Sequence, residues 1–187
     1  GAQLYDSMFR KPVDQLVVSD GTRDFLTKTL FVTPLPFVSR VIFIATPHRG
    51  SYLAGNWLAQ YVASFVSLPQ DLLTNTTELV TGNPDAMFFS SVDDVRGSVH
   101  DMTPGNAFVR SLSAIPVAPG VASHSIIPVT GAPPADGQDD GVVEYASASI
   151  HPIDSEYVIF DASHSVQGEP KAIEEVRRDM ERPVPMD

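Results

Sequence analysis

The feature that most constrains the fold is an unbroken apolar run, VIFIA, at residues 41–45. A strand with one face in water alternates apolar and polar side chains, and this run does not. It therefore predicts a strand buried on both faces, as in a parallel sheet covered by helices. Two further strands are predicted at residues 125–130 (SIIPVT) and 156–161 (EYVIFD). Pro128 has no backbone N–H, so the second strand should be an edge strand or bulged there.

Four helical segments are expected around these strands, at residues 24–31, 53–66, 104–114 and 169–181. Ser19 and Asp20 are N-cap candidates for the first segment, because their side-chain oxygens accept free backbone N–H groups. Pro104 and Pro170 suit the first turns of the third and fourth segments.

Apolar side chains recur at helical spacing in the first and last of these segments. In the first segment they are Phe25, Leu26 and Leu30. In the last segment they are Ile173, Val176 and Met180, which we expect to face the core. Glu174 and Arg178 should form an i,i+4 ion pair on its outer side.

The order strand, helices, strand, loop, strand, helix predicts an α/β fold. We expect a mostly parallel sheet of about three strands with flanking helices. With 187 residues, of which 43% are hydrophobic, the chain can bury one sizeable core. We therefore expect one domain over residues 1–187 rather than two.

Composition argues against several partners and chemistries. The chain has 12 basic and 23 acidic residues, a net charge of −11, which disfavours nucleic acid and anionic lipid surfaces. It has no cysteine, which excludes disulfides, cysteine-ligated zinc and thiol catalysis. There is no apolar run long enough for a transmembrane helix and no signal-peptide pattern, so a cytoplasmic location is the default expectation. Gly1 in place of a Met indicates a processed, cloned or cut start.

A polar cluster follows each predicted strand, at residues 46–51, 139–141 and 163–165. In open α/β sheets ligands bind beyond the carboxyl ends of the strands, so these clusters should approach one edge. Asp140 followed by His164 has the order of the last two members of a Ser–acid–His triad in α/β hydrolases. Two simpler interpretations remain open: an Asp–Gly turn at Asp140 and an exposed turn histidine at His164.

Three segments carry a more specific resemblance: VIFIATPHRGS (41–51), DGVVEYASA (140–148) and ASHSVQ (162–167). Together they resemble the C-terminal portion of a bacterial α/β hydrolase of the lipase/esterase type, across roughly residues 40–180. The resemblance implies that Asp140 is the triad acid and His164 the triad base. It also implies a structural turn near the site, formed by Thr46, Pro47, His48, Arg49, Gly50 and Ser51.

By the same resemblance, residues 1–40 are a cap-like insertion, and residues 41–187 are the C-terminal part of the hydrolase domain. Residues from about 52 to 115 would be a helical cap segment. The family's nucleophile lies in a G-x-S-x-G elbow, and no serine of this sequence has glycine at both −2 and +2. The resemblance thus implies a fragment that keeps the acid and base of a serine ester hydrolase but lacks the nucleophile, and is inactive alone.

Other interpretations stay open beside this one. The chain could be a truncated hydrolase-fold protein that serves as a non-catalytic binding module, since folds host unrelated functions. Ser51 could be recruited as an unusual nucleophile. We expect a homodimer through an exposed sheet edge or the cap helices, a small ester or lipid-like ligand, and no cofactor. Calcium and zinc sites are disfavoured, because EF-hand spacing fails at Gln138 and Ser147 and no H-x-x-x-H pair occurs.

Overall fold

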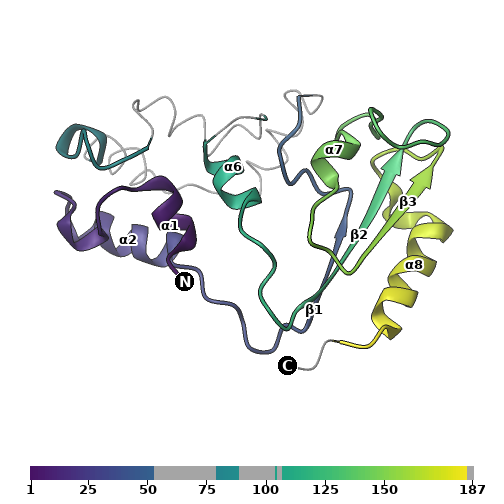
Figure 1. Ribbon diagram of the computed structural model, residues 1–187, viewed down its shortest axis with the longest axis horizontal. Coiled ribbons are helices and arrows are strands. Elements are labelled where there is room, and N and C mark those ends of the chain that lie inside the picture. The colour runs from purple at the N-terminus through teal and green to yellow at the C-terminus, as the bar shows by residue number, and fades with distance from the viewer. Residues whose placement is uncertain (53–78, 89–103, 105–106, 185–187) are drawn as a thin grey trace. The chain divides into compact units, whose positions relative to one another are not determined.

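The computed structural model of the chain describes residues 1–52, 79–88, 104 and 107–184 (Figure 1). The helix predicted at residues 53–66 lies outside the described residues. The chain folds into two compact units, Gly1–Thr33 with Asn56–Ile115 and Pro34–Gly55 with Pro116–Asp187. Length and composition favoured one domain, whereas each of these units has a hydrophobic cluster of its own. We call them the helical unit and the sheet unit.

The sheet unit contains three strands, β1 (Arg40–Ile44), β2 (Ala122–Val129) and β3 (Ser155–Phe160). They pair in the order β1-β2-β3, and both pairs are parallel (Figure 1). The prediction of a small, parallel α/β arrangement is therefore confirmed. β2 is buried along its whole length, as a central strand should be, although its first half carries the polar residues Ser123, His124 and Ser125.

Pro128 lies in the central strand, and its register with β3 is uninterrupted from Ile127 to Val129, so the prediction of an edge strand or a bulge there is wrong. Neighbouring residues of a strand bond to opposite sides, and the carbonyl of Ile126 accepts the N–H of Ala45 on the β1 side. Pro128, two residues later, faces that same side beyond Ile44, the last residue of β1. The missing N–H of proline therefore costs no ladder hydrogen bond.

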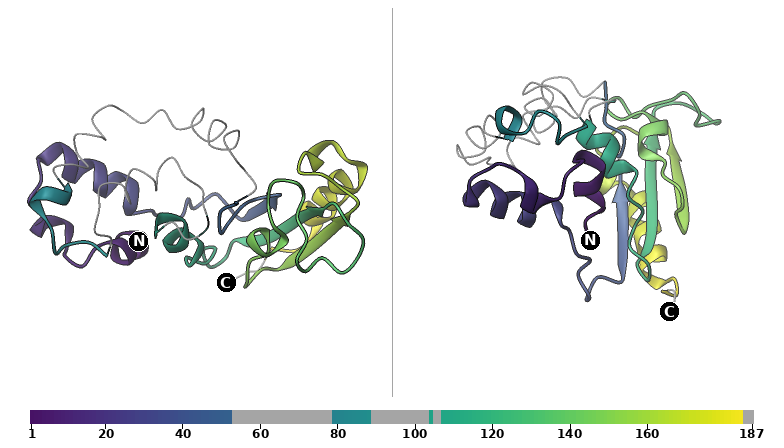
Figure 2. Two further views of the ribbon diagram at one scale, coloured as in Figure 1. Left: turned by 90° about the horizontal axis from the view of Figure 1, so that it is seen from above. Right: turned by 60° about the vertical axis from the view of Figure 1, so that its left-hand side comes forward.

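Helix α8 (Pro170–Glu181) follows β3 through the short 3₁₀ helix η2 (Val166–Gly168). It runs from the carboxyl ends of the strands back toward their amino ends (Figures 1 and 2). Pro170 lies in its first turn, as predicted. A second short helix, α7 (Tyr145–Ala148), lies in the connection between β2 and β3.

The predicted core stripe of α8 is wrong at two of its three positions. Ile173 is 56% exposed and Met180 is 63% exposed. Val176 does pack against the apolar cluster of the sheet. The predicted Glu174–Arg178 ion pair is present, with 3.5 Å between Arg178 Nε and Glu174 Oε1.

The buried face of α8 consists instead of Ala172, Glu175 and Asp179. Its two carboxylates are buried because each is paired. Glu175 Oε2 lies 3.1 Å from Arg178 Nη1, and Asp179 Oδ1 lies 2.9 Å from Arg182 Nε. A pattern search that equates burial with apolar residues cannot find this face.

The helical unit contains α1 (Gln3–Met8), the 3₁₀ helix η1 (Val13–Gln15), α2 (Asp20–Leu30) and α6 (Ala107–Ser113). Ser19 caps α2, with its side chain accepting the Thr22 N–H at 3.3 Å, so this N-cap prediction is confirmed. The helical unit takes in most of the segments expected to be cap-like; that they act as a cap stays a prediction.

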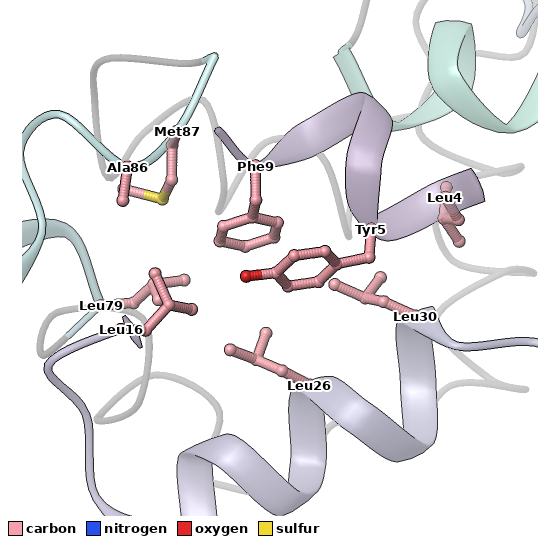
Figure 3. Packing of buried hydrophobic residues seen from close by; sticks show 9 residues of the cluster. All are labelled: Leu4, Tyr5, Phe9, Leu16, Leu26, Leu30, Leu79, Ala86 and Met87. Carbon is pink, nitrogen blue, oxygen red and sulfur yellow. The ribbon is translucent and has the colours of Figure 1, made fainter. Parts of the chain in front are cut away.

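Tyr5 occupies the centre of the apolar cluster of the helical unit. Figure 3 shows its ring among the nine buried members of the cluster, and it stacks on Phe9 with 4.6 Å between centroids. Its hydroxyl donates to the Lys11 carbonyl at 2.6 Å. Burial, with a smaller contribution from Asp14, raises the pKa of Tyr5 to about 12. The phenol therefore stays neutral in this core.

In the described part of the chain, none of the helices combines the length and apolar character that crossing a membrane requires.

Candidate active site

Asp140 and His164 meet beyond the carboxyl ends of β2 and β3. His164 Nδ1 lies 2.8 Å from Asp140 Oδ2, and the His164 backbone N–H donates to the Asp140 carbonyl at 3.0 Å. The Asp140 side chain is 1% exposed and that of His164 is 22% exposed. The two side chains that the sequence singled out, 24 residues apart, therefore form one pair that solvent reaches from the histidine side.

The second oxygen of Asp140 is held by the backbone. Asp140 Oδ1 accepts the N–H groups of Val142 at 2.9 Å and Val143 at 2.7 Å. Gly141 adopts a φ of +90°, which allows the chain to turn tightly around the carboxylate. Asp140 is thus part of an Asp–Gly turn and the partner of His164 at the same time. With Oδ1 committed to the backbone, Oδ2 is oriented toward the imidazole.

The side chain of Gln138 makes three hydrogen bonds that close the loop before Asp140. Its Oε1 accepts the Gly131 N–H at 3.0 Å, and its Nε2 donates to the carbonyls of Ala132 and Pro134. The Thr130 N–H donates to the carbonyl of Asp139 at 2.8 Å. The end of β2 and the start of the Asp140 turn are therefore tied together. No pattern in the sequence identified Gln138 as part of this support.

The turn at residues 46–51 packs against the segment that follows Asp140. The Arg49 N–H donates to Ser147 Oγ at 3.1 Å, and Ser147 Oγ donates to the Gly50 carbonyl at 2.5 Å. The Arg49 guanidinium donates to the carbonyls of Ala146 and Ser149. Three of the six turn residues named from the resemblance, Arg49, Gly50 and Ser51, thus contact residues 142–149 directly.

Two residues with positive φ shape the turn: Ala45, directly before it, and Gly50, within it. Ala45, which precedes Thr46 and Pro47, has a φ of 50°, a region that costs a residue with a Cβ about 1–2 kcal/mol. Gly50 has a φ of 81°, where glycine is favoured. A conformation of this kind persists only where surrounding contacts determine it, and the bonds from Arg49 are such contacts.

Ser51, the alternative nucleophile, has a buried hydroxyl. The residue is 6% exposed, and its Oγ donates to the Val142 carbonyl. A hydroxyl has one proton to donate, and here that proton is directed to a backbone carbonyl. This arrangement argues against Ser51 as an activated nucleophile, which would need its proton directed to the base.

His48 packs its ring edge-on against Phe43, with 4.5 Å between centroids. Burial, with a smaller contribution from the Arg49 charge, lowers the pKa of His48. Its ring is therefore neutral at neutral pH and serves the packing of the turn.

A second histidine–aspartate pair lies at the other end of the strands, where the sequence pattern indicated no function. His124 Nδ1 is 2.7 Å from Ser155 Oγ and 3.4 Å from Asp179 Oδ1. His124 Nε2 is 2.7 Å from Arg40 Nη1, and the side chains of His124 and Asp179 are 2% and 1% exposed. The residue types resemble a triad, but both the serine and the acid are at the same ring nitrogen. A triad needs them at opposite nitrogens.

Within the described residues, no group of three or more histidine, aspartate or glutamate side chains is placed to hold a metal ion. No protein-family model matches the chain, and no curated protein is significantly similar to it in sequence. The interpretation of the site therefore depends on its own geometry.

Proposed function

We propose that the chain provides the acid and the base of a serine ester hydrolase site, on the C-terminal portion of an α/β hydrolase of the lipase/esterase type. The observation that carries the proposal is the 2.8 Å contact between His164 Nδ1 and Asp140 Oδ2. A carboxylate there keeps the proton on Nδ1 and leaves Nε2 as the basic nitrogen. That nitrogen would take the proton of a serine hydroxyl and return it to the leaving alcohol.

The second part of the proposal is that the nucleophile does not come from this chain. The lack of a G-x-S-x-G elbow and the commitment of the Ser51 hydroxyl to the Val142 carbonyl both support it. The ligand class that follows is a small ester or lipid-like acyl compound. The alternative, a non-catalytic binding module on the same fold, would need neither Asp140 nor His164.

The experiment that tests the proposal follows acetyl transfer from p-nitrophenyl acetate to the purified chain. A neutral imidazole attacks such an activated ester without a serine. We expect the rate to fall about tenfold or more in His164→Ala and in Asp140→Asn, because oriented acid–base groups contribute at least that much. His151→Ala removes an exposed histidine and serves as the matched control. Wild-type rates in both site variants would contradict the proposal and favour the binding module.

We also propose that β1 forms a homodimer contact through its open edge. Within the described residues, β1 pairs only with β2, and its five residues are half-buried. An unpaired strand edge offers backbone donors and acceptors to another chain. Light scattering should give twice the chain mass of 20.2 kDa. A monodisperse monomer would contradict this proposal.

A further inference from the structure

We infer that Ser51 and Arg49 are positioning residues that set the orientation of Asp140 toward His164. The inference rests on the proposed function only for what the Asp140–His164 pair does chemically. The contacts of Ser51 and Arg49 that support it all lie within the sheet unit. It gives the turn at residues 46–51 a specific task, where the resemblance implied only a structural one.

A chain of hydrogen bonds leads from Ser51 to His164. The Ser51 hydroxyl donates to the Val142 carbonyl. The N–H of the same residue, Val142, donates to Asp140 Oδ1 at 2.9 Å. Asp140 Oδ2 in turn is 2.8 Å from His164 Nδ1. Ser51 therefore holds the backbone that supplies N–H groups to the Asp140 carboxylate. Ser51 can do this without touching the reacting atoms.

Arg49 is attached to the helix that follows. Its guanidinium donates to the carbonyls of Ala146 and Ser149, at the end of α7 (Tyr145–Ala148). Carbonyls at a helix end have no partner within the helix, and a cation is favourable there. Arg49 thus holds the far end of the segment whose near end Ser51 holds.

A reciprocal bond at Ser147 lies between these two contacts. Its hydroxyl accepts from the Arg49 N–H at 3.1 Å and donates to the Gly50 carbonyl at 2.5 Å. The segment from Val142 to Ser149 is therefore bonded to the turn at residues 46–51 by Arg49, Gly50 and Ser51. Since Asp140 depends on the N–H groups of Val142 and Val143, a shift of this segment would move the carboxylate.

The test reads the hydrogen-bond state of His164 directly. A long-range proton–nitrogen correlation spectrum of the full chain shows which ring nitrogen carries the proton, and solvent exchange of the Nδ1 proton reports its bond to Asp140. In Ser51→Ala we expect that exchange to accelerate about three- to tenfold, as for the loss of one hydrogen bond. Ser51→Thr, which keeps the hydroxyl, should restore slow exchange.

Arg49→Met is the second variant. Because Arg49 is exposed, this variant should fold even if Ser51→Ala does not. It should also accelerate exchange at His164. The matched control is Ser149→Ala, whose hydroxyl donates to Glu156 Oε2 at 2.7 Å and not to the turn. This control should leave the His164 signals unchanged even if it destabilises the fold.

Unchanged His164 signals in both Ser51→Ala and Arg49→Met would overturn the inference, as would an equal change in Ser149→Ala. Asp140→Asn separates this failure from failure of the proposed function. If the wild-type Nδ1 proton is protected and Asp140→Asn removes that protection, the pair exists. Its chemical use is then tested independently by acetyl transfer.

Discussion

His164–Asp140 and His124–Asp179 lie at opposite ends of the same three strands. The first pair follows the strands, and its histidine side chain is 22% exposed. The second lies beside the first half of β2 and is at most 2% exposed. In the first pair, the aspartate receives two backbone N–H groups and one imidazole nitrogen. In the second, the aspartate and a serine share one imidazole nitrogen, and an arginine occupies the other.

Residue types alone therefore do not define a catalytic pair. A guanidinium can only donate, so His124 Nε2 must accept from Arg40 and the ring must be neutral. Both ring nitrogens of His124 have partners inside the protein. This suits a structural role, in which His124 of β2 helps to hold α8 through Asp179. His164 has an oriented acid and solvent access, which suits acid–base chemistry.

The largest expected effect is the loss of the buried acid. Asp179→Ala should lower the free energy of unfolding by about 3 kcal/mol, the upper end of the cost of leaving buried polar groups unpaired, because His124 Nδ1 and the Ser155 hydroxyl lose their buried acceptor. Urea unfolding followed by circular dichroism measures this. Asp24→Ala, which removes an exposed ion pair with Lys28, is the control, with a change below about 1 kcal/mol. Equal effects in the two variants would contradict a structural role for the buried pair.

Asp140→Asn, in contrast to Asp179→Ala, should affect acetyl transfer strongly and stability only modestly. The amide oxygen can still accept from Val142 and Val143, so we expect the free energy of unfolding to fall by only about 1–2 kcal/mol. The amide nitrogen would face His164 Nδ1 and favour the wrong tautomer. The rate of acetyl transfer should therefore fall about tenfold or more, while the protein stays folded. A variant that loses stability as severely as Asp179→Ala would place Asp140 among the structural acids.

The pH dependence of stability should depend on His124. Burial is the largest influence and lowers the pKa of His124; Asp179 and Asp154 oppose this, while Arg40 and Arg182 reinforce it. The pKa of His124 is lower in the folded state than its unfolded value of about 6.5. Its contribution to the free energy of unfolding is therefore complete above a pH of about 6.5 and is lost as the pH falls from there toward the folded-state pKa. The slope is at most about 1.4 kcal/mol per pH unit for one group.

Urea unfolding between about pH 7.5 and 5.5 measures this slope, which should be flatter in His124→Asn. His48, whose pKa is also lowered, contributes with the same sign, so His48→Asn is measured alongside. An unchanged slope in His124→Asn would show that the buried pair does not titrate with folding.

The smallest expected effect concerns the outer face of α8. Ile173→Gln should change the free energy of unfolding by less than about 0.5 kcal/mol, because the side chain is 56% exposed. Ala172→Leu, one residue away on the buried face, should cost about 1–3 kcal/mol through overpacking. If Ile173→Gln destabilised the chain more than Ala172→Leu, the helix would face the sheet with the side that its apolar pattern predicts.

Local signals account for what the sequence predicted well. The run VIFIA predicted a strand of a parallel sheet, and β1 is such a strand, but its five residues are half-buried rather than buried on both faces. Ser19 could be recognised as an N-cap from its chemistry alone. The pairing of Asp140 with His164 was expected because loops after parallel strands share one edge of the sheet.

Long-range pairing explains what the sequence did not predict. On the buried face of α8, Asp179 contacts His124 of strand β2, a contact that goes beyond the local i,i+3 pairs of Glu175 and Asp179 with arginines of the same segment. Pro128 occupies a central strand without loss, because β1 ends before reaching it. Neither fact can be read from residues nearby in the sequence. The same holds for Gln138, whose hydrogen bonds depend on how its loop folds back.

We propose that the chain holds an acid and a base oriented for ester hydrolysis but no nucleophile. Fluorophosphonate labelling of the purified chain, read by intact mass beside His164→Ala, tests it most directly. We expect a folded sample with no adduct that depends on His164. A single stoichiometric adduct that disappears in His164→Ala would contradict it, because it would reveal a complete serine site within these 187 residues.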